Sequence, residues 1–415
     1  MTPVCIGIKG YREVRSQSNE QEEIWVELEE EARSCRYCGS ERLVSKGRYE
    51  RQARHLEVFG RESRLKIMTR RWECRQCGKS FLSDTPGLRP WRRSTEPWRE
   101  SVYRDHHEGI CASAMARLRR LGSATVGRIY AEFTSRKARE RESLQCPQVL
   151  GIDEHRVHRG MPFATTFCDL KNRRIFDIVP GRSERELGTF LGRLQGREKV
   201  KVVCIDLSSS YRALVRKWFP NARIVADRFH VIRVLQHHFL DLARQIVPEL
   251  KNHRGLLGVL RRHPSKLDER QQARLQKLLG DYPALQPLYE KMIELWELLR
   301  LKHQSAKACR RHIGQLLRLI EQLRRSAFEP LERLASTLHS WREALVTMWR
   351  FTKNNGITEG FHRKMKLIQR RAYGFRNFHN YRLRVIAQCE ANKTSTNDLV
   401  PTFWRRPRDG RFSEC

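Results

Sequence analysis

The sequence lacks the features that mark membrane-spanning, secreted and low-complexity chains. It has no long apolar run and no signal peptide, so we expect a soluble, intracellular protein. Glycine and proline are not enriched, at 24 and 15 of 415 residues, which excludes a low-complexity chain. The chain is too long for one ordinary domain and predicts two to four.

Acidic residues are scarce relative to basic ones. The chain has 47 Asp and Glu against 82 Lys and Arg, a net charge of +35. Such a charge opposes compaction by self-repulsion unless a polyanion is the usual partner. A membrane surface is one candidate polyanion, but nothing in the sequence inserts into a membrane. Nucleic acid is therefore the favoured partner.

Four of the 12 cysteines form two Cys-x-x-Cys pairs, Cys35 with Cys38 and Cys74 with Cys77. A glycine follows each pair and lets the backbone turn so that both thiolates reach one ion. Two such pairs predict a closed, tetrahedral zinc site. The alternative is four unrelated thiols. The scattered remaining cysteines are typical of reduced thiols rather than of a disulfide framework.

The residues around these pairs predict a zinc-binding module over 35–85. Between the pairs, apolar residues alternate with polar ones and indicate a β-hairpin that brings the pairs together: Leu56, Val58, Leu65 and Ile67. Residues 1–34 are interpreted as an N-terminal arm. We expect its acidic patch EQEEIWVELEEEAR to form a short helix.

Residues 90–145 resemble a helix-turn-helix DNA-binding region. The region begins with two basic, Trp-containing turns, PWRRSTEPWRES. Two apolar helical faces follow, separated by a turn at Gly122 and Ser123: Met115, Leu118 and Leu121, then Val126, Ile129 and Tyr130. Arg128 and Arg136, with Arg139, are candidates for contacts to DNA phosphates. The alternative is a solvated basic face.

From residue 146 the apolar period changes from helical to strand-like. VLGIDEHRV, MPFATTFCDL and RRIFDIVPG predict an antiparallel meander. A helix follows, with Ser183 as N-cap and Glu186 three residues on, the pattern of a capping box. Two apolar strands joined by a crossover helix come next. This βββαβαβ order predicts a mixed α/β sheet, the pattern of a ribonuclease H-like domain, whose first part spans 146–240.

Residues 241–345 predict an all-helical insertion that packs on the sheet domain. In IGQLLRLIEQL an apolar stripe recurs at helical spacing: Ile313, Leu316, Leu317, Ile320 and Leu323. The second part of the core then spans 346–395, and a polar tail occupies 396–415.

Two aspartates stand where apolar strands end, and they predict a metal site. Asp153 ends the apolar part of the first strand, and Asp206 ends that of the fourth. If those strands are neighbours, both carboxylates emerge at one sheet edge, and Glu359 on a late helix could complete the cluster. Glu154 is expected to point to the opposite face from Asp153. The alternative is that these acids cap helices or pair with arginines.

Oxygen ligands of this kind suit Mg²⁺ or Mn²⁺. Two such ions could activate the attacking and leaving oxygens of a phosphodiester displacement.

Glu359 is surrounded by basic residues in the stretch FTKNNGITEGFHRKMKLIQRRAYGFRN. On a helix Glu359, Arg363 and Lys366 share one face. The charged residues of this face could simply form ion pairs with one another. Alternatively, Glu359 holds a cation while the neighbouring basic residues bind phosphates: Arg363, Lys364, Lys366, Arg370 and Arg371.

Taken together, the motifs resemble the ISL3 family of bacterial insertion-sequence transposases. The resemblance rests on GIDEH around Asp153, IDLSSSY around Asp206, ADRFHV around Asp227, and NGITEGFHRKMK around Glu359 followed by RRAYGFRN. It implies an Asp153, Asp206 and Glu359 triad with two Mg²⁺ or Mn²⁺ ions. The sequence departs from the family pattern at Ser209 and His362. Asp227 and His230 belong to the resemblance with their roles open: a further acid oriented by a histidine, or a local ion pair and a helix cap.

The resemblance also implies a function. Such an enzyme would bind double-stranded DNA at the terminal repeats, cut there with water, and join the freed 3′ hydroxyl to target DNA. It would act in the cytoplasm at the nucleoid, as a homo-oligomer assembled on DNA. Two alternatives are a non-catalytic DNA-binding regulator and an RNA-directed nuclease of the ribonuclease H type.

Overall fold

The structure is a computed structural model that describes residues 6–142, 145–157, 163–351, 356–375 and 377–389. The chain divides into two compact units, Met1–Lys137 and Ala138–Cys415. No helix among the described residues combines the length and the apolar character that crossing a bilayer requires. Two basic residues of the stretch around Glu359, Lys353 and Arg376, lie outside the described residues.

The first unit contains a five-stranded sheet. Its strands are β1 (Tyr11–Ser18), β2 (Glu22–Leu28), β3 (Leu43–Val58), β4 (Arg61–Cys74) and β5 (Ser80–Leu82). The order is β1-β2-β4-β3, with β5 paired to β4. The β-hairpin predicted between the cysteine pairs is confirmed as β3 and β4, in which Leu65 and Ile67 are fully buried.

The short helix predicted in the acidic patch is wrong, because that patch contains β2. Ile24 and Val26 alternate inward with the neighbouring charged residues, a period of two, and both are buried. β2 pairs antiparallel with β1 and parallel with β4, so both of its edges are hydrogen-bonded.

Three helices complete the first unit: α1 (Glu96–Glu108), α2 (Ala112–Leu118) and α3 (Ser123–Glu142). Met115, Val126 and Ile129 pack in their core, as predicted. Two expectations are wrong. The second basic turn is the start of α1, where Thr95 caps the helix and Trp98 is buried. Leu118, at the end of α2, is 66% exposed.

The second unit contains the predicted mixed sheet. Its strands are β6 (Val149–His155), β7 (Ala164–Asp169), β8 (Arg174–Pro180), β9 (Val202–Ile205) and β10 (Arg223–Ala226). The order is β10-β9-β6-β7-β8. The first three in sequence form the antiparallel meander, while β9 is parallel to both β6 and β10. Helices α4 (Glu184–Arg193) and α5 (Ser209–Trp218) connect the strands, and Ser183 caps α4 in the predicted capping box.

The helical region predicted after the sheet is confirmed. It contains α6 (Arg228–Ile246), α7 (Arg254–Leu260), α8 (Glu269–Asp281), α9 (Leu285–Arg300), α10 (Ala306–Arg324), α11 (Glu329–Ser340) and α12 (Arg342–Arg350). These helices share one apolar core with the sheet. Arg228 joins them by donating to the carbonyl oxygens of Leu299, Leu301 and Met348. The predicted stripe of α10 is wrong at Leu317, which is 41% exposed, while Leu319 is buried.

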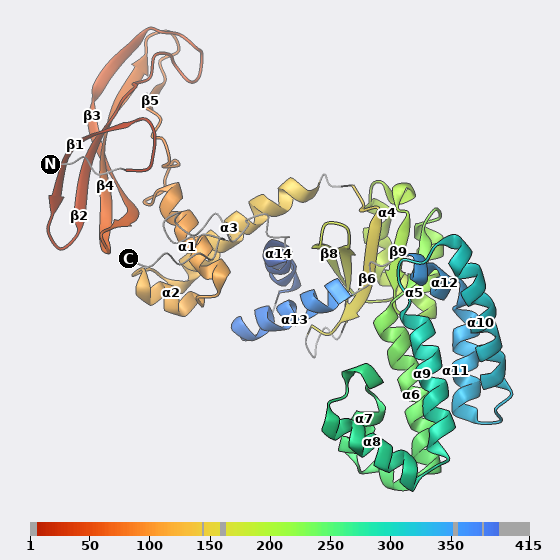
Figure 1. The fold of residues 1–415 in the computed structure, drawn as a ribbon. Helices are drawn as coiled ribbons and strands as arrows, with labels where there is room; N and C mark the ends of the chain where they lie inside the picture. Colours follow the sequence, from red (N-terminus) through yellow and green to blue (C-terminus); the bar gives the residue numbers. More distant parts are fainter. Residues whose placement is uncertain (1–5, 143–144, 158–162, 352–355, 376, 390–415) are drawn as a thin grey trace, which may run out of the picture. The chain divides into compact units, whose positions relative to one another are not determined.

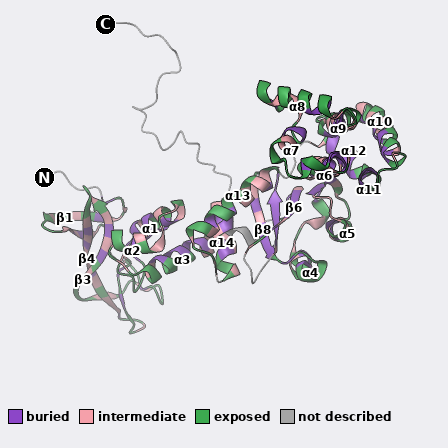
Figure 2. Cartoon of the chain, turned by 90° about the horizontal axis from the view of Figure 1, so that it is seen from below, coloured by how far each residue is buried: buried purple, intermediate pink, exposed green. Residues whose placement is uncertain are grey.

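Two late helices cover part of the sheet's other face. α13 (Gly356–Arg371) contacts β6, and α14 (Phe378–Gln388) contacts β8 (Figure 1). Met365 and Ile368 from α13 and Tyr381 from α14 pack with Ile175 and Ile178 of β8 in a second core. The strands between the helices are therefore largely buried, as Figure 2 shows for β6 and β8.

Candidate active site and zinc site

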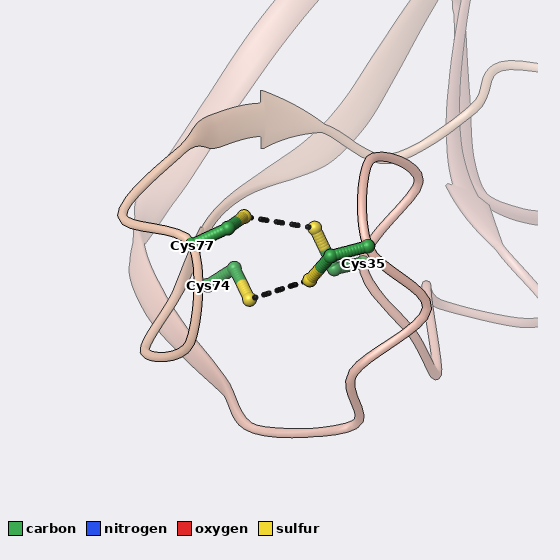
Figure 3. A group of neighbouring side chains, drawn as sticks. Cys35, Cys74 and Cys77 are labelled. Carbon is green, nitrogen blue, oxygen red and sulfur yellow. Dashed lines mark hydrogen bonds between the residues drawn. The ribbon is translucent and has the colours of Figure 1, made fainter.

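The four cysteines of the first unit form a compact cluster (Figure 3). The Sγ atoms of Cys35 and Cys77 are 3.7 Å apart, and those of Cys38 and Cys74 are 3.5 Å apart. The glycines that follow the pairs, Gly39 and Gly78, have φ of 75° and 69°, the left-handed backbone that glycine favours. The turns predicted from the spacing are therefore present.

This cluster fits a tetrahedral zinc ion. A Zn–S distance of about 2.3 Å in a tetrahedron separates sulfur atoms by about 3.8 Å. All four ligand atoms lie within 4.8 Å of one another, and in the described part of the chain no other group of three or more His, Cys, Asp or Glu residues does so. Four thiolates leave no position for water, so such an ion is structural.

In the second unit, three aspartates lie level with one another on three adjacent strands. The pairing of Gly151 with Cys204, continued by two residues, places Asp153 on β6 beside Asp206, which follows β9. Asp227 follows β10, and its amide donates to the carbonyl of Ile205 at 2.7 Å. The condition for a shared sheet edge, that these two strands are neighbours, is therefore met, since β6 pairs with β9 in parallel.

Burial makes the carboxylates of Asp153 and Asp206 costly in their charged form. Burial raises the pKa of Asp153 to about 7, and the nearby charges of Asp206 and Asp227 add to the shift, which His230 opposes. Burial also raises the pKa of Asp206. The Oδ1 atoms of Asp206 and Asp227 are buried without a hydrogen-bond partner. Unpaired, buried carboxylate oxygens at one sheet edge are suited to a cation.

His230 accompanies Asp227. Its Nδ1 lies 2.8 Å from Oδ2 of Asp227, and this hydrogen bond raises the pKa of His230. Asp227 thus occupies the same sheet edge with a histidine that orients it, one of the two possibilities left open by the sequence. The local ion pair with an arginine is not found among the described residues. Asp227 stands at the N-cap of α6 without a side-chain capping bond.

Glu359 is half-buried in the first turn of α13. His362, one turn further on, shares its helix face and places Nδ1 3.7 Å from Oδ2 of Asp153. Burial lowers the pKa of His362 to about 4, helped by Lys366 and His230, so this contact is not an ion pair at neutral pH. The face of α13 that bears His362 is therefore turned toward Asp153, and Glu359 lies one turn before His362 on this helix.

A buried polar chain beside Asp153 was missed by sequence reasoning. His362 Nε2 lies 3.2 Å from Oγ1 of Thr166, which lies 3.0 Å from Nδ1 of His155. His155 Nε2 in turn lies 3.0 Å from the hydroxyl of Tyr381. The chain links α13, β7, β6 and α14. A polar residue two positions after Asp153 on the same strand face was the available signal, but its partners are too distant in sequence to be inferred.

Glu154 is not isolated from the acids. Its side chain lies 3.8 Å from Arg182, as expected for the opposite strand face. Burial is the main cause of the raised pKa of Asp206, and the negative charge of Glu154 nevertheless adds to that shift. Glu154 is therefore unsuitable as a neutral control for the site.

The predicted DNA-binding residues differ in their surroundings. Arg136 pairs with Glu96 and Glu132 at 3.5 and 3.6 Å, and Lys364 donates to the carbonyl of Gln388. Arg128 is exposed and donates to Thr125. The others are also exposed on α13: Arg363, Lys366, Arg370 and Arg371.

Comparisons with known proteins match this arrangement. Residues 150–385 match the transposase domain of the ISL3 family of DDE transposases. Residues 31–77 match the zinc finger of the IS204/IS1001/IS1096/IS1165 transposases. The transposase for insertion sequence element IS1001 of Bordetella parapertussis is 29% identical over 86% of this chain and 89% of its own length. The transposase for IS1557 of Mycobacterium tuberculosis H37Rv is 24% identical over 64% and 65%.

Proposed function

This chain belongs to the ISL3 family of DDE transposases, and on that premise we propose that Asp153, Asp206 and Glu359 are its catalytic carboxylates. The reaction is cleavage of a phosphodiester at the element end, followed by strand transfer into target DNA. The single observation that carries this assignment is the level placement of Asp153 and Asp206 on neighbouring parallel strands, with α13 docked against β6.

The fold we propose for the second unit is ribonuclease H-like. Its support is the order β10-β9-β6-β7-β8, with an antiparallel meander joined to parallel strands. Helices pack on both faces of this sheet. In such a sheet the carboxyl ends of the parallel strands are the expected place for a ligand. Asp206 follows β9 at that end, and Asp227 follows β10.

We propose that Asp153, Asp206 and Glu359 hold Mg²⁺ or Mn²⁺, two ions in all, with Asp227 as a neighbouring acid. The orphaned oxygens of Asp206 and Asp227 fit this donor set. When bound, such ions lower the pKa of an attacking water and neutralise charge on a leaving oxygen.

The protein's own residues position the reactants. The chain from His362 through Thr166 to His155 holds the wall beside Asp153 in place. Exposed Arg363 and Lys366, on the helix that carries Glu359, are placed to bind phosphates of the DNA strand. Water attacks first, and the freed 3′ hydroxyl attacks target DNA next, so no covalent protein intermediate is needed.

The first unit is proposed to recognise the terminal repeats. Its zinc ion would stabilise the two Cys-x-x-Cys turns, and α3 would present Arg128 to DNA. Because an element has two ends to be held together, we propose that the enzyme works as a homo-oligomer on DNA. Its substrate places it at the bacterial nucleoid, in the cytoplasm.

The direct test is cleavage of a labelled end-repeat duplex with and without Mg²⁺. We expect a nick at the element end only when Mg²⁺ is present. Tight binding with no cleavage under any divalent cation would instead identify a DNA-binding regulator. Equal cleavage of an RNA–DNA hybrid that lacks the repeat would identify a ribonuclease H-type nuclease.

A further inference from the structure

The first unit contains an open, arginine-rich groove, and part of its lining adjoins the zinc-binding cysteines: Arg36, Tyr37 and Phe81. Its volume is about 1250 Å³, and it runs between β3 and β4 on one side and residues 80–93 on the other. Six arginines and three acidic residues line it, so the groove carries net positive charge. Arg71 and Arg93 are exposed and make no ion pair with the described residues, whereas Arg36 is held by Asp84 at 2.6 Å.

At the rim of this groove stands Trp91, whose side chain is 98% exposed. Its φ is 62°, a left-handed conformation that costs energy for any residue with a Cβ atom. A large aromatic residue held in a strained turn and fully exposed to water is doubly unfavourable for the isolated protein. What points to a partner is the place of this ring at the edge of a positively charged groove, where it can contact the bases of a nucleic acid.

The turn that carries Trp91 is fixed on both sides. The amide of Arg54 donates to the carbonyl of Arg93 at 3.0 Å, and the amide of Glu96 donates to the carbonyl of Gly87 at 2.7 Å. Arg51 Nη1 donates to Thr85 Oγ1 at 2.8 Å, joining β3 to the other wall. Trp91 is therefore presented by a rigid support.

We propose that this groove binds the DNA duplex of the element end, with phosphates on Arg71 and Arg93 and with Trp91 as a wedge against a base step. The proposal rests on the DNA-binding role of the first unit given above. Guanidinium groups that are free of acidic partners bind phosphates, and apolar wedges kink duplexes at single steps. An acidic peptide would account for the charge but would leave the strained, exposed tryptophan unexplained.

The test measures binding of a labelled end-repeat duplex to the full chain by fluorescence anisotropy, between 50 and 200 mM salt. Trp91→Gly removes the wedge and relieves the left-handed strain. We expect it to melt at an equal or higher temperature and to bind about 5- to 150-fold more weakly with an unchanged salt slope. Arg71→Ala with Arg93→Ala should flatten the log–log salt slope by about 1.8, since two phosphate contacts are lost.

Matched controls come from the same unit. Phe59 is 96% exposed with φ of 51° at the tip of the β3–β4 hairpin, and it does not line the groove. Phe59→Gly repeats the change of Trp91→Gly outside the groove, and Arg33→Ala removes one exposed charge elsewhere. Both should bind DNA within about twofold of the unaltered protein.

Unchanged binding by Trp91→Gly, or equal weakening by Phe59→Gly, would overturn the proposal. So would tighter binding to the single strand than to the duplex. These outcomes leave the catalytic assignment intact, because Asp153→Asn is expected to lose cleavage while binding normally. If the groove variants fail to bind and Asp153→Asn still cleaves, the groove stands and the triad is wrong.

Discussion

The two metal sites proposed for this transposase are built in opposite ways. The zinc site is assembled from two short turns, and its four sulfur atoms already lie at ligand distance from one another. The acidic site draws on β6, the end of β9 and α13, and its carboxylates do not form a closed ligand set among the described residues. Like charges held together by a fold repel until a cation lies between them.

The difference corresponds to the roles proposed for the two sites. A structural ion stabilises the fold that holds it, so its ligands come from local turns. A catalytic site needs oxygens with open positions for the reacting groups, and it must be built on elements fixed by the rest of the fold. We therefore expect loss of a cysteine to damage folding, and loss of an acid to damage chemistry.

The largest effect on stability should follow loss of a zinc ligand. Structural zinc contributes about 10 to 16 kcal/mol to folding in zinc-finger peptides. Cys35→Ser or Cys77→Ser should lose zinc, unfold the zinc module and weaken specific end binding. Zinc content and thermal melting check this, with Cys111→Ser as the control because Cys111 lies outside the cluster. Reduced, chelator-free protein that contains no zinc would contradict it.

Magnesium should stabilise the second unit by a smaller amount. A ligand present at one hundred times its Kd stabilises the native state by about 2.7 kcal/mol. We expect Mg²⁺ to raise the melting temperature of the unaltered protein, and Asp206→Asn to lose most of that rise. Glu184→Gln should keep it, because Glu184 is exposed and pairs with Lys217. An equal rise in all three proteins would place the ion elsewhere.

The packing that supports the acidic site can be weakened without touching its carboxylates. Arg382 of α14 donates to both oxygens of Asp177 on β8, at 2.5 and 2.6 Å. Because this pair is largely buried, Asp177→Ala should cost about 2 to 3 kcal/mol and reduce cleavage more than DNA binding. Glu184→Ala breaks an exposed pair and should cost less than about 1 kcal/mol. If chemical denaturation gives the same loss of unfolding free energy for Asp177→Ala and Glu184→Ala, the pair between Arg382 and Asp177 does not anchor α14.

The smallest effect should come from a locally encoded cap. Ser183→Ala removes the capping box of α4 and should cost about 1 kcal/mol. The pKa of Glu186 is lowered from 4.5 to about 2, first by the hydrogen bond from the Ser183 side chain and then by those from the backbone amides of Ser183 and Arg182. A lowered carboxyl pKa stabilises the fold above pH 4.5, and this stabilisation is lost as the pH falls toward 2. The loss of unfolding free energy caused by Ser183→Ala, measured by denaturation, should therefore be smaller at pH 3 than at pH 7.

The sequence predicted what short patterns encode. Paired Cys-x-x-Cys spacing led to the cysteine cluster, Ser183 and Glu186 led to the capping box, and strand-end aspartates led to one sheet edge. Each depends on a few neighbouring residues and on general geometry. The antiparallel meander and the parallel crossover strands also followed, because these two kinds of connection differ in length.

What the sequence did not predict depends on tertiary contacts. The charged residues on both sides of Ile24 favoured a helix in the sequence. The segment is instead strand β2, because its pairing with β1 and β4 outweighs the local helix preference. Leu118 and Leu317 fit apolar stripes, but no element among the described residues covers them. The hydrogen bond between His155 and Tyr381 joins residues 226 positions apart, which no local pattern reveals.

The central claim is that Asp153, Asp206 and Glu359 carry the chemistry, and the most direct test is end cleavage by their isosteric variants. Asp153→Asn, Asp206→Asn and Glu359→Gln should each bind the labelled end-repeat duplex normally and lose cleavage by about 10³-fold, because each removes one anionic ligand. Glu184→Gln should cleave like the unaltered protein. Normal cleavage by any of the three variants would contradict the assignment of that residue to the triad.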